Sequence, residues 1–378
     1  MKYQCSLLDT QHISTVDTKT LLERLSIEDH QVIEYYFTEN NIYVWFFGSK
    51  DQIFIMTELK QNGKKISSRQ LKKRVMSLLK NLSNINAPIK EIDTFSKSLY
   101  NILIPQVIQK KLRPGHPVII VPHGCLHLLP FQALRSDAGY LKDYIDISYS
   151  PSASLYLHTL DRDEQLTKKE IRLLAILNPI NDTNLITIRQ EEELPFFYPQ
   201  PPSKYYANTN RPDLLKDKDA TTNIVLQEMC DFRFVHIFTH GEFNFEKPLD
   251  SYILLSDGRL TAGKIYDMIE SNSNFEINAS LVTLAACESG SADILYGDEV
   301  LGLPRAFLYA GATSLLTSLW RADANFTERL IVRLYEKLAA GYSKSRSFNE
   351  ALMETMALNE KYAHPFYWAT FILIGDQK

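Results

Sequence analysis

A cysteine and a histidine each close an apolar run in this sequence, and these two side-chain types together can perform nucleophilic catalysis. Cys287 closes a run that begins at Leu281, and His240 closes a run that begins at Phe232. A continuous apolar run bounded by turn residues is typical of a buried strand. The carboxyl ends of strands in a parallel sheet present reactive groups to ligands. We therefore predict that a thiol and an imidazole lie at neighbouring strand ends.

The chemistry of this pair is attack on a carbonyl carbon. A cysteine attacks as the thiolate, and a nearby histidine promotes that form. His240 lies 47 residues before Cys287, which leaves room for one strand–helix unit between two adjacent strands. Gly241 allows the backbone beside the histidine to approach a substrate closely. The backbone N–H groups of Gly241 and Cys287 are candidate donors to the oxyanion.

Structural interpretations of the same residues stay open. A lone cysteine after an apolar strand is usually a small buried residue, and a histidine there often bonds a loop carbonyl. His236 alternates onto the strand face of His240 but lies deeper, so we interpret it as structural. Cys125 follows His123 too closely for good dyad geometry. Ser289 is a rival nucleophile without the G-x-S-x-G elbow.

The composition excludes several classes of protein. A chain of 378 residues that is 45% hydrophobic can form two domains or one large bilobal domain. Its net charge of −4 argues against electrostatic binding of nucleic acid or an anionic membrane. Its four cysteines form no C-x-x-C pair and no metal-like spacing, so we expect no metal, no disulfide framework and no cofactor. The N-terminus lacks a signal-peptide core and the apolar runs are too short for a membrane span, so we expect a cytoplasmic protein.

The elements that must position the pair follow from apolar periodicity and turn signals. A helix over 18–29 precedes an antiparallel meander of strands at 31–37, 42–47 and 52–58, and helices over 67–82 and 92–112. A charged connector is expected at 161–169. Further strands are expected at 117–121, 145–149, 171–177, 251–255, 313–320 and 369–374, with helices near 220–230, 299–309, 325–340 and 347–358. This alternation predicts an α/β fold with helices on both faces of a mostly parallel sheet.

Two stretches of the chain echo one another. The segments 118–124 and 235–241 both have the pattern of a strand followed by His-Gly. Duplication of an ancestral half explains this echo, and so does chance, because the match is short.

Several ordered motifs resemble those of CHAT-domain proteases, which belong to the caspase-like cysteine peptidase clan that also contains separase. The similar segments are 119–127, 129–134, 149–155, 239–241, 284–290, 302–312, 318–320 and 366–371. The resemblance implies a caspase-like fold with His240 and Cys287 as the catalytic dyad. It also implies an N-terminal pseudo-protease half, residues 1–165, packed against a catalytic half, residues 166–378. His123 would then be a relic of an inactive site.

The same resemblance bears on specificity. Several clan members carry an acidic or amide side chain two residues before the nucleophile, and Ala285 at that position carries no charge. We therefore expect a largely apolar substrate pocket. The segment 320–323 resembles one that lines the substrate groove, where Arg321 could attract an acidic residue and Asp323 a basic one. Asp323 could equally cap the helix that begins near Asn325.

The function expected from these observations is a caspase-like cysteine endopeptidase that hydrolyses a protein substrate without a cofactor. Control is expected from an activating protein partner, from proteolytic maturation or from the loop 289–298, which contains Gly290 and Gly297. Analogy with relatives implies a role in bacterial defence. Two alternatives stay open: a catalytically silent interaction module with the same fold, and a small-molecule thiol hydrolase with a deep enclosed pocket.

Overall fold

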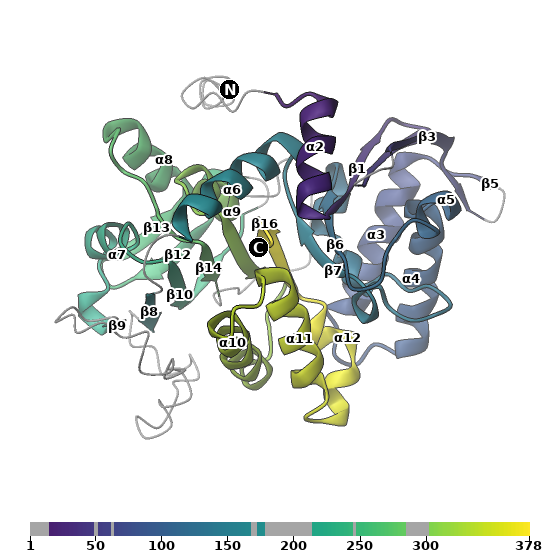
Figure 1. The fold of residues 1–378 in the computed structure, drawn as a ribbon. Coiled ribbons are helices and arrows are strands. Elements are labelled where there is room, and N and C mark those ends of the chain that lie inside the picture. Colours follow the sequence, from purple (N-terminus) through teal and green to yellow (C-terminus); the bar gives the residue numbers. More distant parts are fainter. Residues whose placement is uncertain are drawn as a thin grey trace.

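A single large sheet organises the protein (Figure 1). The structure is a computed structural model that describes residues 15–48, 52–61, 64–167, 172–177, 214–244, 247–284 and 302–378. The sheet has 11 strands in the order β3-β2-β1-β6-β7-β16-β15-β14-β10-β8-β9, and helices pack on both sides of it. The predicted α/β class with a helix-covered, mostly parallel sheet is therefore confirmed.

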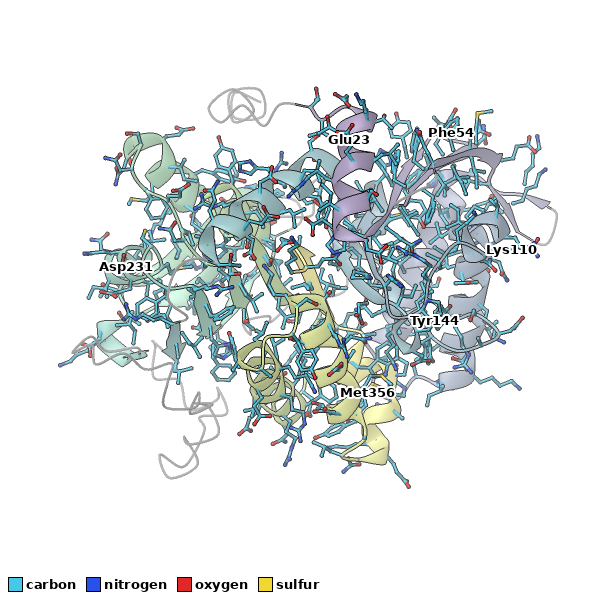
Figure 2. The ribbon with its side chains drawn as sticks, in the orientation of Figure 1. Glu23, Phe54, Lys110, Tyr144, Asp231 and Met356 are labelled. Carbon is cyan, nitrogen blue, oxygen red and sulfur yellow. The ribbon has the colours of Figure 1, made fainter. Side chains whose placement is uncertain are left out.

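The first part of the sheet is the antiparallel meander that the sequence predicts. It consists of β1 (Gln31–Phe37), β2 (Asn41–Phe47) and β3 (Gln52–Glu58), and a small separate pair, β4 (Lys60–Gln61) and β5 (Lys64–Lys65), follows. Helix α2 (Thr18–Glu28) precedes the meander. On the outermost strand β3, Phe54 points to solvent with 54% of its surface exposed (Figure 2).

The helix expected over 92–112 is interrupted. Helix α3 (Ser68–Leu82) is capped by Ser67, whose hydroxyl accepts the N–H of Gln70, and α4 (Ile89–Leu103) follows it. The chain then restarts as the short helix α5 (Gln106–Gln109). Pro105 causes the break, because proline has no N–H to donate and disfavours helical geometry at the preceding residue. Ile104 accordingly has φ −112° and ψ 89°.

The expectation of a connector at 161–169 is wrong for its first part. After β6 (Pro117–Val121), the 3-10 turns η1 (Gly124–Leu128), η2 (Phe131–Ala133) and η3 (Leu141–Asp143), and β7 (Asp146–Tyr149), helix α6 (Ala153–Leu166) continues through the charged residues. Those charges bind partners from distant elements. Arg24 lies 2.8 Å from Asp161, and Arg162 pairs with Glu276.

The C-terminal part alternates strands and helices largely as predicted. Its elements are β8 (Leu173–Leu177), β9 (Leu214–Lys216), α7 (Thr222–Glu228), β10 (Phe234–Phe238), β11 (Gly241–Glu242), η7 (Pro248–Asp250), β12 (Tyr252–Leu255), β13 (Gly258–Thr261), α8 (Ala262–Ser271), β14 (Leu281–Leu284), α9 (Gly302–Tyr309), β15 (Ser314–Ser318), α10 (Ala324–Ala339), α11 (Lys344–Met356), η8 (Glu360–Ala363), α12 (Pro365–Trp368) and β16 (Phe371–Gly375). The sequence did not indicate the short strands β9, β11 and β13. Strands β11, β12 and β13 form a separate three-stranded sheet.

Outside the antiparallel strands β2 and β3, the large sheet is formed by two blocks of parallel strands that run in opposite directions. β9, β8, β10, β14 and β15 are parallel, and β1, β6, β7 and β16 are parallel to one another. The blocks meet at the antiparallel pair β15–β16. The carboxyl ends of β10, β14 and β15 therefore share one edge of the sheet, which we call the His240 edge. The carboxyl ends of β6 and β7 lie at the opposite edge.

A buried ion cluster lies at that opposite edge. Lys344 Nζ is 3.0 Å from Asp163 Oδ1 and 2.9 Å from Asp376 Oδ2, and the three side chains are almost completely buried. Asp163 also accepts hydrogen bonds from Ser280 and Thr313, at the amino ends of β14 and β15. Removing one member of such a cluster leaves an uncompensated buried charge, so the cluster holds α6, α11 and the C-terminal segment together.

Candidate active site

His240 is held in place through its backbone. It lies two residues beyond β10, a central strand flanked by β8 and β14. The Thr239 hydroxyl donates a hydrogen bond to the carbonyl oxygen of Leu254 at 2.7 Å. The carbonyl oxygen of His240 accepts one from the N–H of Leu254 at 2.8 Å. Strand β12 thus fixes the chain on both sides of the Thr239–His240 peptide bond, and the His240 side chain is half-buried.

The backbone N–H of Gly241 is directed away from β12. Gly241 and Ile253 are opposite one another in the antiparallel pair β11–β12. Residues in such a pair alternate between hydrogen-bonded and non-hydrogen-bonded positions. Because His240 and Leu254 occupy a hydrogen-bonded position, Gly241 occupies the other kind. β11 is an edge strand of its small sheet, so this N–H points away from that sheet, and Gly241 itself is buried.

Strand β14 brings the chain that leads to Cys287 next to the chain that leads to His240. β10 and β14 are parallel neighbours, with His236 opposite Thr283 and Ile237 opposite Leu284. β14 is buried along its whole length. Cys287, Ala285 and the loop 289–298 lie outside the described residues.

The turn η7 and Ser251, which lead into β12, pack against the start of α9. A Cβ atom at Gly302 would lie 2.1 Å from the carbonyl oxygen of Pro248 and 2.6 Å from the Ser251 hydroxyl. Such distances are far below van der Waals contact, so this position requires glycine. The Ser251 hydroxyl in turn accepts a hydrogen bond from the N–H of Asn244 at 2.9 Å. The close approach fixes the first turn of α9 against the chain that precedes β12.

The segment 320–323 lies at the His240 edge, directly after β15. Arg321 is exposed. Asp323 caps α10: its carboxylate accepts a hydrogen bond from the N–H of Phe326 at 2.9 Å, and its carbonyl oxygen accepts one from the Thr327 hydroxyl at 2.8 Å. The helix-capping interpretation of Asp323 is therefore confirmed, and any contact with a substrate would have to share this carboxylate.

The two histidines set aside from the sequence lie away from this site. His236 is buried in the core, edge-on to the ring of Tyr335 at 6.1 Å. Burial lowers the pKa of His236 to about 4, so its imidazole is neutral at neutral pH. His123 follows β6 and therefore lies at the opposite edge of the sheet, against the rings of Tyr36 and Phe37.

Neither a metal site nor a membrane span stands out in the ranges that the structure describes. No three or more His, Cys, Asp or Glu side chains of those ranges gather in a way that could hold a metal ion. None of the helices described is long and apolar enough to cross a bilayer.

The sequence singles out His240 and Gly241 as candidates but not the elements that support them. The strand at 251–255 was expected, but nothing in the sequence paired it with His240, and β13 and the glycine at 302 carry no reactive group that would point to the site. The signal that could have pointed to the hairpin β12–β13 is the Asp257-Gly258 pair between two short apolar runs. Gly258 indeed has a φ of +128°, which only glycine adopts readily.

Comparison with known proteins gives a family. The model of the CHAT domain matches residues 93–376. Tetratricopeptide repeat protein 28 of Homo sapiens is 32% identical over 117 residues, which are 31% of this chain and 4% of that protein. The Mus musculus protein of the same name is 30% identical over 117 residues. This chain thus matches only a small part of the length of these curated relatives.

Solved structures share the fold. The separase chain of the Saccharomyces cerevisiae separase–securin complex superimposes with a TM-score of 0.63 at 13% identity, over 98% of this chain and 33% of that chain. A second crystal structure of the complex gives a TM-score of 0.58 over 96% of this chain and 32% of that chain. At this identity the likeness establishes the caspase-like fold alone. The family model covers most of the sequence, and the chain therefore belongs to the CHAT domain family.

Proposed function

We propose that this protein is a cysteine endopeptidase in which Cys287 is the nucleophile and His240 the general base. The observation that carries the proposal is the register of β10 and β14. Ile237 lies opposite Leu284, and each is followed three residues later by a dyad residue, His240 and Cys287 respectively. Neighbouring strands lie about 4.8 Å apart, so equal intervals after register partners favour contact between the two side chains.

The mechanism follows from this pairing. His240 accepts the thiol proton of Cys287, and the thiolate attacks the carbonyl carbon of the scissile peptide bond. The N–H groups of Gly241 and Cys287 stabilise the oxyanion. His240 then donates the proton to the leaving amine, which leaves a thioester. Water, deprotonated by His240, hydrolyses the thioester and restores the thiol. The direction of the Gly241 N–H, away from β12, supports its part in this scheme.

The proposal includes a catalytically silent N-terminal half, residues 1–165, and a catalytic half, residues 166–378. β6 and β10 are each the third strand from the β15–β16 junction, on opposite sides of it, and each is followed by His-Gly. Ile120 on β6 lies opposite Tyr149 on β7. The N-terminal counterpart of Cys287 is therefore Ser152, three residues after Tyr149. Its hydroxyl accepts the N–H of Leu155 at 3.1 Å, which is a helix-capping role.

Substrate binding is assigned to Ala285, Arg321 and Asp323. Ala285 supplies no charge at the position two residues before the nucleophile, so a largely apolar pocket is expected there. Because the Asp323 carboxylate caps α10, the exposed guanidinium of Arg321 is the better placed of the two charges to contact an acidic substrate residue. A partner protein is expected to control access, and a cytoplasmic location remains part of the proposal. The two curated relatives named above are mammalian, so they give no support to a role in bacterial defence.

The decisive experiment is a cleavage profile on a peptide library. Cys287→Ala and His240→Ala are expected to reduce cleavage by at least about a thousandfold without unfolding the protein. The matched control is His123→Ala, which removes the corresponding histidine of the other half and should leave cleavage unchanged. A peptidyl electrophile should label the wild-type protein and spare Cys287→Ala. A folded, partner-bound protein that neither cleaves nor reacts would instead identify a silent interaction module.

A further inference from the structure

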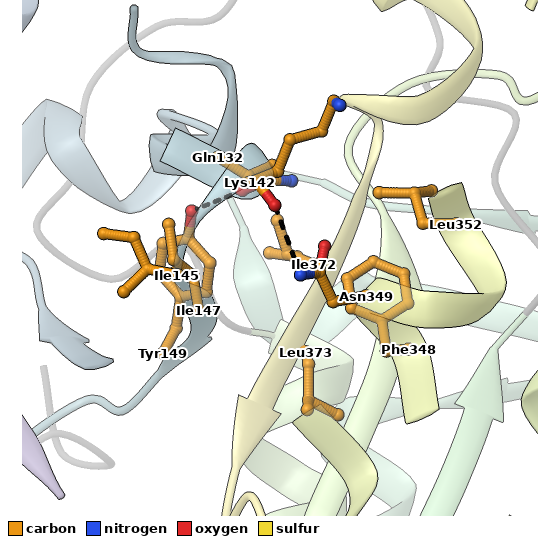
Figure 3. Close-up of a pocket in the computed structure, with 10 residues that line it drawn as sticks. All are labelled: Gln132, Lys142, Ile145, Ile147, Tyr149, Phe348, Asn349, Leu352, Ile372 and Leu373. Atoms are coloured by element: carbon orange, nitrogen blue, oxygen red, sulfur yellow. Dashed lines mark hydrogen bonds between the residues drawn. The ribbon is translucent and has the colours of Figure 1, made fainter. Parts of the chain in front are cut away.

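Three sequence segments with no catalytic role assigned to them meet at one place in the fold. They are the segments 129–134, 318–320 and 366–371, which contain Gln132, Trp320 and Thr370 respectively. They meet at the start of β16, where Gln132 donates to the Phe371 carbonyl and Trp320 bonds with Thr370. Gln132 lies beside the seam between β7 and β16 (Figure 3). The seam lies next to the His240 edge, because β16 begins there.

Strands β7 and β16 are joined loosely. Their register has one pair, Tyr149 opposite Ile374, whereas β15 and β16 share five pairs from Ser314–Gly375 to Ser318–Phe371. Between β7, β16 and α11 lies a cavity of about 10 Å³, lined by Gln132, Lys142, Tyr149 and Asn349 together with apolar side chains (Figure 3). That volume is at the lower limit for one water molecule, so the cavity is not a ligand site.

The Gln132 side chain replaces the backbone hydrogen bonds that the seam lacks. Its amide Nε2 donates to the carbonyl oxygen of Phe371 at 2.6 Å and, more weakly, to that of Ala369 at 3.4 Å. Its Oε1 accepts a hydrogen bond from the Tyr149 hydroxyl at 2.9 Å. The same hydroxyl accepts the N–H of Phe131 at 2.7 Å. Gln132 is only 4% exposed, so bulk solvent has little access to these contacts.

On the other side, the same short segment 369–371 holds the chain that leaves β15. The N–H of Leu319 donates to the carbonyl oxygen of Thr370 at 2.8 Å. The Thr370 hydroxyl accepts the N–H of Trp320 at 3.1 Å and donates to its carbonyl oxygen at 2.9 Å. One stretch of three residues is thus bonded to Gln132 on one side and to Trp320 on the other. Arg321 follows immediately.

We propose that Gln132 is a positioning residue for the segment 320–323, acting through the backbone of 369–371. Its amide fixes the carbonyl groups of Ala369 and Phe371, which flank Thr370, and Thr370 fixes both backbone groups of Trp320. The effect on catalysis rests on the proposed function, because it assigns Arg321 and Asp323 to substrate binding. A structural change in the N-terminal half would then alter the position of the segment 320–323, although Gln132 itself does not touch the substrate.

Hydrogen exchange tests the positional part of this proposal without any activity. Gln132→Met keeps the size of the side chain and removes the donor. The matched control is Gln31→Met, because Gln31 is also buried, donates to the carbonyl oxygen of Lys111 at 2.8 Å and accepts the N–H of Arg113 at 3.3 Å. Exchange of the Leu319 and Trp320 amides should become about threefold to thirtyfold faster in Gln132→Met and stay unchanged in Gln31→Met. Unchanged exchange, or equal acceleration in both variants, overturns the proposal.

Two further measurements complete the test. Tyr149→Phe, a milder change that removes the hydroxyl bound to Gln132, should accelerate the same two amides to a smaller extent. In the cleavage assay, Gln132→Met should raise KM for a library peptide with little change in kcat, because the groove shifts and the dyad does not. An equal rise of KM in Gln31→Met contradicts this. If the wild-type protein cleaves nothing, the proposed function fails, and the exchange comparison alone decides the role of Gln132.

Discussion

Thr239, the residue before the candidate catalytic His240, donates a hydrogen bond from its hydroxyl to the carbonyl oxygen of Leu254. We predict that Thr239→Val lowers kcat/KM about tenfold, because the imidazole loses its fixed position and the Leu254 carbonyl loses a partner. The cost in stability should be about 0.5–1.5 kcal/mol. Thr239→Ser keeps the hydroxyl and should behave like the wild type. Peptide cleavage and chemical unfolding of both variants check this, and equal activity of the two would refute it.

A methyl group at Gly302 should disrupt the packing of the turn η7 on α9. The added Cβ would lie 2.1 Å from the Pro248 carbonyl oxygen, so Gly302→Ala should lower the free energy of unfolding by about 1–3 kcal/mol, the usual cost of overpacking. Gly263→Ala is the matched control, because its Cβ would approach the same turn at Leu249 only to 3.4 Å. That variant should lose less than about 0.5 kcal/mol. Thermal unfolding measures both, and a Gly302→Ala protein as stable as Gly263→Ala would contradict the contact.

Substitutions of Asp323 distinguish a helix-capping role of its carboxylate from a contact with the substrate. Asp323→Ala should cost about 1 kcal/mol of stability, because the N–H of Phe326 loses its acceptor. Asp323→Ser restores an acceptor without the charge and should recover that stability. If the carboxylate only caps α10, the serine variant also cleaves the peptide library with an unaltered profile. A selective loss of cleavage beside basic residues in Asp323→Ser would show that the carboxylate contacts substrate as well.

The ion cluster predicts a pH dependence of stability. Burial raises the pKa of Asp376 to about 6, against 3.8 for an exposed aspartate, and Lys344 opposes that rise. The folded state therefore binds the proton of the Asp376 carboxyl group more tightly than the unfolded chain does. Its stabilising effect is complete below about pH 4 and is lost as the pH rises through 6, by about 1.4 kcal/mol for each unit of pKa.

The companion residue Asp163 acts in a different pH window. Burial alone would raise the pKa of Asp163, but Lys344 and the hydroxyl donors Ser280 and Thr313 outweigh burial and lower it. Its contribution is present above pH 3.8 and is lost as the pH falls below that value. Unfolding free energies of wild type and Asp376→Asn, compared from pH 4 to 7, isolate the Asp376 part. The wild type should lose stability relative to the variant over this range, and parallel curves would contradict the assignment.

Much of the fold follows from local sequence signals. Buried strands such as β10 and β14 appear as uninterrupted apolar runs, and Thr261, a residue type favoured as a helix cap, caps α8 by accepting the N–H of Lys264. The break after Ile104 was also readable, since Pro105 stands in the sequence. The continuation of α6 was not, because the partners of its charges, Arg24 and Glu276, come from distant elements.

The candidate site was predictable in its reactive groups and not in its supports. His240 and Gly241 stand out by type and position, and the assignment of His240 with Cys287 as a dyad stays a prediction. The anchoring of His240 by β12 depends on a hairpin whose strands are too short to show a period. The role of Gln132 could not be predicted either, because it depends on the weak pairing of β7 with β16, two strands that lie far apart in the sequence. The boundary between the two halves also stays a prediction.

Strand β16 has five register pairs with β15 but one with β7. This difference determines where the sheet would separate under mechanical load. By direction, β16 belongs with the N-terminal strands. By bonding, it belongs to the C-terminal ones, so a pulling force that separates the two halves would peel β7 away and leave β16 attached to β15. The line of least resistance in the sheet therefore passes beside Gln132, which bridges it through its side chain together with the Ser148–Gln377 hydrogen bond.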